Sequence, residues 1–125
     1  MKITAFNPLI VTKDAKAVTE LFEVLGFEHA HKKTGINDDV TSFDMKHPGG
    51  FRVDVAQVDQ MPQDMTAIRM NVRDFDEAYK FLTEHGFKNA QGDKVTETGS
   101  SKATLMVSPS GFAISLAEHI RKDNE

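Results

Sequence analysis

The stretch that decides the fold occurs twice in this chain. Residues 14–27 read DAKAVTELFEVLGF and residues 74–87 read DFDEAYKFLTEHGF, so each copy runs from an Asp to a Gly-Phe pair with the same spacing. A second pair of segments agrees at nearly the same offset: residues 48–55 read PGGFRVDV and residues 109–116 read PSGFAISL. Two separated blocks at nearly the same offset are unlikely to arise by chance and indicate a duplicated half-domain. Two copies are too few for a solenoid.

Each block has the pattern of a short amphipathic helix. Asp14 is suited to cap the free N–H groups of a first turn, and Asp74 with Glu77 has the spacing of a capping box. Gly26 and Gly86 stand where a helix would end. Apolar residues at helical spacing predict the buried faces, namely Val18, Leu21, Phe22 and Leu25 in the first copy and Ala78, Phe81 and Leu82 in the second.

Apolar and alternating runs around both helices predict the strands. We expect strands at 3–12, 27–33, 40–46 and 51–58 in the first copy, and at 66–72, 87–90, 103–108 and 112–118 in the second. The order is βαβββ twice, within one domain that covers residues 1–125. We place module one at about 3–58, a polar linker at 59–65, module two at about 66–118 and a charged tail at 119–125.

Composition excludes several classes of protein. The 125 residues are 39% apolar and 27% charged, which is typical of one globular domain. The absence of cysteine excludes disulfide scaffolds and thiolate metal sites. A net charge of −4 with dispersed Lys and Arg argues against nucleic-acid binding. No apolar run approaches the ~20 residues of a membrane span, so we expect a cytoplasmic protein with no membrane partner.

The tandem βαβββ order resembles the vicinal oxygen chelate superfamily, which includes glyoxalases, bleomycin-resistance proteins and extradiol dioxygenases. The segments that carry the resemblance are LIVTKD at 9–14, LFEVLGF at 21–27 and the two Pro-x-Gly-Phe turns. The resemblance implies an α+β fold in which two modules curl a mixed sheet into a cup, with the helices outside and a ligand or metal inside. It also implies a homodimer.

The resemblance further implies where a metal would bind. Catalytic members use a His or Gln on the first strand of a module and a Glu on its last strand. The matching residues here are Asn7, Asp54, Ala67 and Ser115. Catalytic zinc needs three good protein ligands, and only Asp54 is a common ligand of first-row metals. We therefore expect no standard metal site and no cofactor. If a divalent metal binds, Asn7 and Asp54 are the best candidates to hold it.

Alternation along the strands extends the candidate site. If Asp54 faces the cup, so does Arg52, and if Ala67 faces it, so do Arg69 and Asn71. The complete set of candidate ligand-binding residues is Asn7, Arg52, Asp54, Arg69, Asn71 and Ser115. An arginine in such a set can hold a carboxylate or phosphate. The alternative is an internal network in which the arginines only neutralise Asp54.

These observations favour a glyoxalase- or bleomycin-resistance-like protein that binds a small molecule in its cup without the standard catalytic metal. Whether it is an enzyme is left open, and the catalytic residues are not identified. The alternative is a metal-dependent lyase, isomerase or dioxygenase-type enzyme with a non-standard site. A third interpretation is that the function resides in the dimer surface and that the cup binds no ligand.

Overall fold

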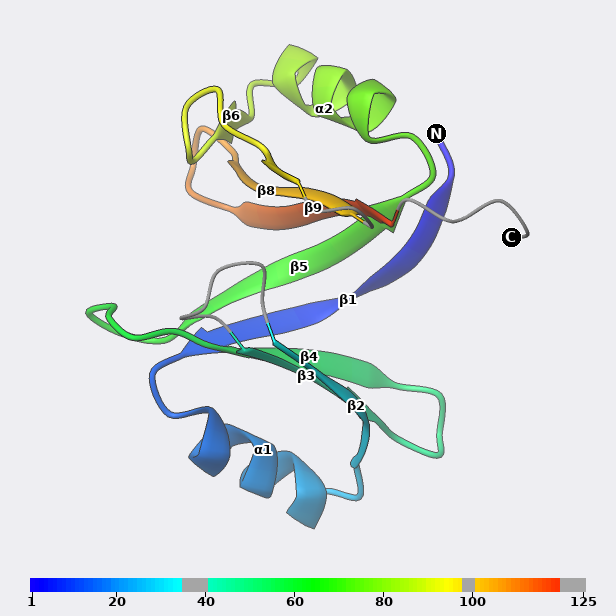
Figure 1. The fold of residues 1–125 in the computed structure, drawn as a ribbon, viewed down its shortest axis with the longest axis vertical. Coiled ribbons are helices and arrows are strands. Elements are labelled where there is room, and N and C mark those ends of the chain that lie inside the picture. Colours follow the sequence, from blue (N-terminus) through cyan, green and yellow to red (C-terminus); the bar gives the residue numbers. More distant parts are fainter. Residues whose placement is uncertain (35–40, 98–100, 120–125) are drawn as a thin grey trace. The chain divides into compact units, whose positions relative to one another are not determined.

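The computed structural model describes residues 1–34, 41–97 and 101–119 (Figure 1). The helices of these residues are α1 (Ala15–Val24) and α2 (Phe75–Glu84). The strands are β1 (Ile3–Thr12), β2 (Glu28–Thr34), β3 (Thr41–Lys46), β4 (Arg52–Gln57), β5 (Met65–Val72), β6 (Lys88–Asn89), β7 (Thr96–Glu97), β8 (Ser101–Val107) and β9 (Ala113–His119). The predicted α+β class is confirmed. Residue 40, expected in a strand, and residues 120–125 of the expected tail lie outside the described residues.

The chain divides into two compact units. We call Asn7–Ala67 the first unit, and Met1–Phe6 together with the described residues from Ile68 onward the second unit. In the first unit the strand order is β2-β3-β4-β1, and β4 runs parallel to β1. In the second it is β6-β8-β9-β5, where β9 runs parallel to β5 and the short β7 also pairs with β8. The two orders correspond strand for strand, apart from β7, which the sequence pattern did not predict.

Both helices begin and end as their sequences predict. Asp14 accepts a hydrogen bond from the backbone N–H of Ala17 at 3.1 Å, and Asp74 accepts one from Glu77 at 3.1 Å. The chain leaves each helix through a glycine with positive φ, +99° at Gly26 and +91° at Gly86. Residues that carry a side chain rarely adopt this backbone conformation, which explains the glycine at each position.

A second contact, between distant residues, fixes each helix to the last strand of its own unit. The backbone N–H of Ala15 donates to Gln57 Oε1 at 2.8 Å, and that of Phe75 donates to Glu118 Oε1 at 2.6 Å. These N–H groups belong to the first turn, where no helical partner exists. The last strand therefore supplies a second cap and holds the start of each helix against the sheet.

The predicted buried face of the helices was partly wrong. Leu21 and Leu25 were expected in the core, but they are 56% and 55% exposed. The buried residues of α1 are instead Ala15 and Thr19. In α2, Phe81 is likewise exposed, while the buried residues are Phe75, Ala78 and Leu82. Because the strand anchors the first residue of each helix, the buried face starts there and not one turn later.

The cores lie between each helix and its sheet. In the second unit the buried cluster joins Met70 and Val72 of β5, Ile114 and Leu116 of β9, and three residues of α2. Because side chains alternate along a strand, Arg69 and Asn71 lie on the face of β5 away from α2, as the alternation predicted. In the first unit, Met45, Val53 and Val55 are buried on β3 and β4, against which α1 packs.

Neither described helix is long and apolar enough to cross a membrane.

Candidate functional site

Two candidate residues of the first unit share one face of its sheet. Leu9 of β1 pairs with Asp54 of β4, and neighbours paired in register point to the same side. Asn7 lies two residues before Leu9 and therefore shares that face. Asn7 is 7% exposed and Asp54 is 3% exposed. Asn7 donates from Nδ2 to the carbonyl of Pro8 at 3.0 Å. Arg52, at the start of β4, is exposed.

Asp44 is a residue of this face that the sequence reasoning missed. It pairs directly with Asp54 across β3 and β4, so the two carboxylates stand on neighbouring strands. Residues paired in this way have Cβ atoms about 4.5–5.5 Å apart. The signal was present in the turn. His47 donates its backbone N–H to Phe51 at 2.8 Å, and counting back from that closed turn pairs Asp44 with Asp54.

The candidate residues of the second unit also share one face. Arg69 of β5 pairs with Ser115 of β9, and Asn71 pairs with Ala117. Both pairs lie on the side of the sheet away from α2. Asn71 Oδ1 is buried and has no hydrogen-bond partner among the described residues. A buried oxygen left in this state costs about 1–3 kcal/mol, so a bound donor would stabilise it.

The donors at the four positions expected to hold a metal do not fit the metal site that the family resemblance implies. Ala67 offers a methyl group, and the hydroxyl of Ser115 is a poor ligand for first-row metals. Among the described residues no group of three or more His, Cys, Asp or Glu side chains could hold a metal ion. The His29 ring lies 3.1 Å from Glu23 Oε2 and is exposed. His31, two residues further along β2, has a side chain that lies outside the described part of the chain.

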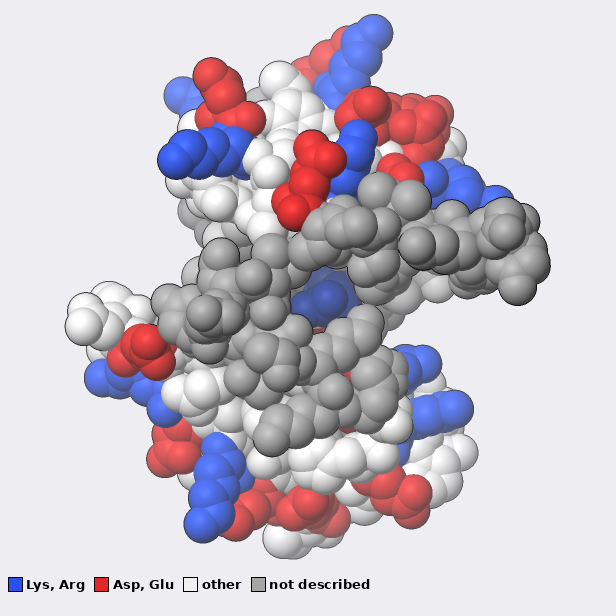
Figure 2. Space-filling view, viewed as in Figure 1, with Lys and Arg blue, Asp and Glu red and all other residues white. Residues whose placement is uncertain are grey.

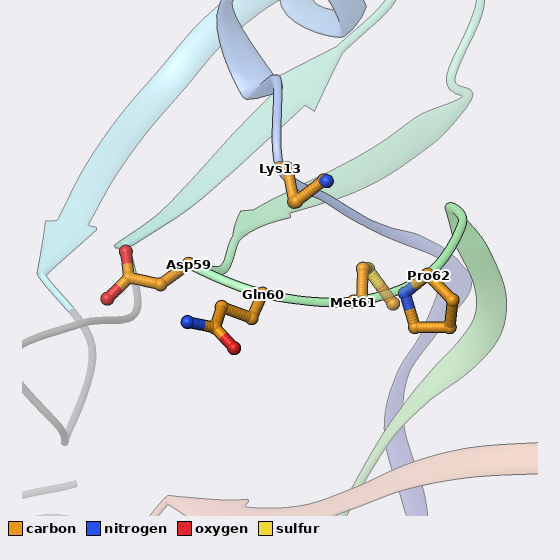
Figure 3. A pocket seen from close by; sticks show the side chains of 5 residues that line it. All are labelled: Lys13, Asp59, Gln60, Met61 and Pro62. Atoms are coloured by element: carbon orange, nitrogen blue, oxygen red, sulfur yellow. The ribbon is translucent and has the colours of Figure 1, made fainter.

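Two hollows in the first unit involve residues that the sequence reasoning did not single out together. One has a volume of about 410 Å³ and is lined by Glu28, His29, Ala30, Lys46, His47, Pro48 and Gly50. In it, His47 Nδ1 accepts from the backbone N–H of Gly49 at 2.8 Å, so the neutral ring carries its proton on Nε2. The other, of about 510 Å³, lies beside the linker and is lined by Lys13 and residues 59–62 (Figure 3).

Charged side chains of both signs mix over the helices. Figure 2 shows Lys and Arg beside Asp and Glu in the regions of both α1 and α2. On α2 these include Asp76, Glu77 and Lys80, and Lys102 of β8 lies 3.8 Å from Asp76. In this view neither helix region is dominated by one sign of charge.

Solved structures with the same fold are numerous, although their sequences differ greatly from this one. Methylmalonyl-CoA epimerase from Mycobacterium tuberculosis is 14% identical with a TM-score of 0.70, over 93% of this chain and 88% of that chain. A glyoxalase/bleomycin resistance protein/dioxygenase superfamily member from Vibrio splendidus 12B01 is 15% identical with a TM-score of 0.61. The match covers 94% of this chain and 99% of that chain.

A third structure carries a ligand. Streptomyces coelicolor methylmalonyl-CoA epimerase, a Q60A variant in complex with 2-nitronate-propionyl-CoA, is 15% identical with a TM-score of 0.67, over 94% of this chain and 98% of that chain. No protein-family model and no curated protein matches the sequence.

The similarity therefore rests on three-dimensional structure. TM-scores of 0.61 to 0.70, with 88–99% of each chain covered, indicate a common fold. At such low identity the likeness concerns the fold and not the activity. The chain has the vicinal oxygen chelate fold.

Proposed function

We propose that this protein binds a small organic molecule on the face of the second unit's sheet that lies away from α2, without the metal site that the family resemblance implies. The observation that carries the proposal is the buried Asn71 Oδ1, which has no hydrogen-bond partner among the described residues. It lies on the same face as Arg69 and Ser115, which are neighbours across β5 and β9. A cationic group, a hydroxyl and an open acceptor on one face suit a polar ligand.

Each of these side chains has a definite role in the proposal. The guanidinium of Arg69 pairs with a carboxylate or phosphate of the ligand. The hydroxyl of Ser115 donates or accepts a hydrogen bond beside it. Asn71 Oδ1 accepts from an N–H or O–H of the ligand, because a carbonyl oxygen can only accept. In the first unit, Arg52, Asp54 and Asn7 are the corresponding candidates for ligand contact.

The test compares variants in a ligand-observed NMR screen of small carboxylates and phosphate monoesters. We expect Arg69→Gln to weaken the bound compounds by about 10- to 100-fold, since hydrogen bonds to charged groups contribute roughly 1.5–3 kcal/mol. Arg73→Gln is the matched control, because Arg73 is exposed just after β5. Equal affinities in the two variants, or a screen without any bound compound, would contradict the proposal.

Asn71→Leu separates a binding role from a structural one. If Asn71 Oδ1 awaits a ligand, its replacement raises the free energy of unfolding of the unliganded protein by about 1 kcal/mol and weakens ligand binding. A structural role predicts the opposite change in stability. Urea unfolding monitored by circular dichroism measures the first quantity, and the NMR screen measures the second. This variant also keeps the proposal testable if Arg69→Gln fails to fold.

The metal-dependent lyase, isomerase or dioxygenase-type alternative would rely on Asn7 and Asp54 as oxygen donors. The number of divalent ions bound per chain distinguishes this alternative from the binding proposal: the alternative predicts about one, and the binding proposal predicts none. The expected homodimer and cytoplasmic location remain part of the proposal, and sedimentation and cell fractionation test them.

A further inference from the structure

The larger hollow of the first unit is built from two segments that meet at the ends of parallel strands. Lys13 follows β1, and residues 59–62 follow β4, its parallel neighbour. Figure 3 shows Lys13 on one side and the run from Asp59 to Pro62 along the other. The volume of about 510 Å³ is within the range of small-molecule sites.

Hydrogen bonds fix these two segments to each other. Gln57 Nε2 donates to the carbonyl of Lys13 at 2.6 Å and to that of Val58 at 2.9 Å. The backbone N–H of Val58 donates to the carbonyl of Thr12 at 2.9 Å. The backbone that carries Lys13 and Asp59 is therefore held in place before any ligand binds, which lowers the entropic cost of binding.

The side chains around the hollow carry opposite charges that do not neutralise each other. Lys13 and Asp59 are both exposed, and within the described residues neither forms an ion pair. Gln60, the residue after Asp59, offers an amide that can both donate and accept. Met61 and Pro62 supply an apolar wall, and Met61 is half-buried. A thioether side chain adapts readily to the shape of an apolar ligand.

We propose that this hollow binds a small zwitterion, in which an ammonium and a carboxylate are separated by a short apolar chain. Lys13 pairs with the carboxylate of the ligand and Asp59 pairs with its ammonium, while Met61 and Pro62 provide apolar surface at the Lys13 end of the hollow. A molecule with a single charge leaves one of the two protein charges without a partner. The hollow is broad and open, so the binding is weak and depends on both charges together.

The test is a ¹H–¹⁵N NMR titration of the full chain with 4-aminobutanoate, 5-aminopentanoate and 6-aminohexanoate as probes. We expect shifts confined to the amides of Lys13 and of residues 59–61 and their neighbours. At least one probe should bind about tenfold more tightly than the alkanoate and the alkylamine of the same chain length, as two contacts in place of one predict. Equal affinity for the singly charged compounds, or no shift up to about 50 mM, would overturn the proposal.

Variants link the binding to the two charges. Lys13→Met and Asp59→Asn should each weaken the best probe by about tenfold. The double variant Lys13→Glu/Asp59→Lys exchanges the charges and should restore affinity to within about threefold, because the ligand can bind in the reverse direction. Lys16→Met and Asp64→Asn are matched controls, since both residues are exposed charges outside the hollow. Unchanged affinity in Lys13→Met, or equal losses in the controls, would contradict this assignment.

Discussion

At the scale of single residues, Gln57 shows how one amide group can organise a local region. Its Oε1 accepts from the backbone N–H of Ala15, and its Nε2 donates to the carbonyls of Lys13 and Val58. It thereby joins the start of α1 to the end of β4. In the second unit Glu118 has the corresponding place and accepts from the N–H of Phe75.

We predict that Gln57→Leu lowers the free energy of unfolding by about 1–2 kcal/mol, because it leaves backbone groups without their partners. Urea unfolding followed by circular dichroism measures the change. Gln63→Leu is the control; this residue is exposed in the linker, and its replacement should change stability by no more than about 0.5 kcal/mol. Similar unfolding midpoints for the two variants would show that Gln57 does not anchor the helix.

The sequence could reveal the caps at Asp14 and Asp74 but not the one at Gln57. A side chain that caps a helix three residues away leaves a local pattern of residue types. Gln57 reaches Ala15 across 42 positions of sequence, and only the alignment of β4 beside β1 brings them together. Asp44 was missed for a different reason: the turn at residues 47–50 sets the register of β3 against β4, and the pairing with Asp54 was not counted back from it.

At the scale of elements, the glycine that ends each helix lies close to the hairpin turn that precedes the last strand of its unit, β4 or β9. A Cβ on Gly26 would lie 3.1 Å from Nε2 of His47, and one on Gly86 would lie 3.1 Å from Cγ of Pro109. The two units use different side chains at the same place in the fold. Both glycines therefore satisfy two requirements, a positive φ and a close approach.

Gly26→Ala and Gly50→Ala separate these two requirements. Gly50 has φ +97° but nothing within 4 Å of an added Cβ, so its replacement reports backbone strain alone, about 1–2 kcal/mol. We predict that Gly26→Ala costs about 1 kcal/mol more, because the added methyl group meets His47. Urea unfolding of both variants, with and without His47→Ala, measures the difference. An excess that persists without the His47 ring would exclude this contact as its cause.

The elements themselves were easier to predict than the faces they bury. Apolar spacing and the flanking Asp and Gly residues located both helices closely. The same spacing assigned Leu21 and Leu25 to the core, where the structure leaves them exposed. Periodicity defines an apolar stripe on a helix but not which part of the stripe packs against the sheet. In α1 the packed part is set by the N-terminal turn, which Gln57 anchors.

At the scale of the whole chain, the repeated segments of the sequence made the fold predictable. The two repeated blocks gave the βαβββ order, and structures with 14–15% identity share that fold. The site is less predictable, because it depends on which residues neighbouring strands place side by side. Alternation correctly placed Arg69 and Asn71 on one face, but nothing in the sequence indicates that Asn71 Oδ1 is left without a partner among the described residues.

In the proposal above, this chain binds a small organic molecule and holds no divalent metal at the positions that the family resemblance implies. A native mass spectrum of protein purified without chelator tests it most directly. We predict no stoichiometric divalent ion, and an organic adduct that Arg69→Gln and Asn71→Leu lose while Arg73→Gln retains it. About one divalent ion per chain, absent from Asp54→Asn, would contradict the claim and favour the metal-dependent alternative.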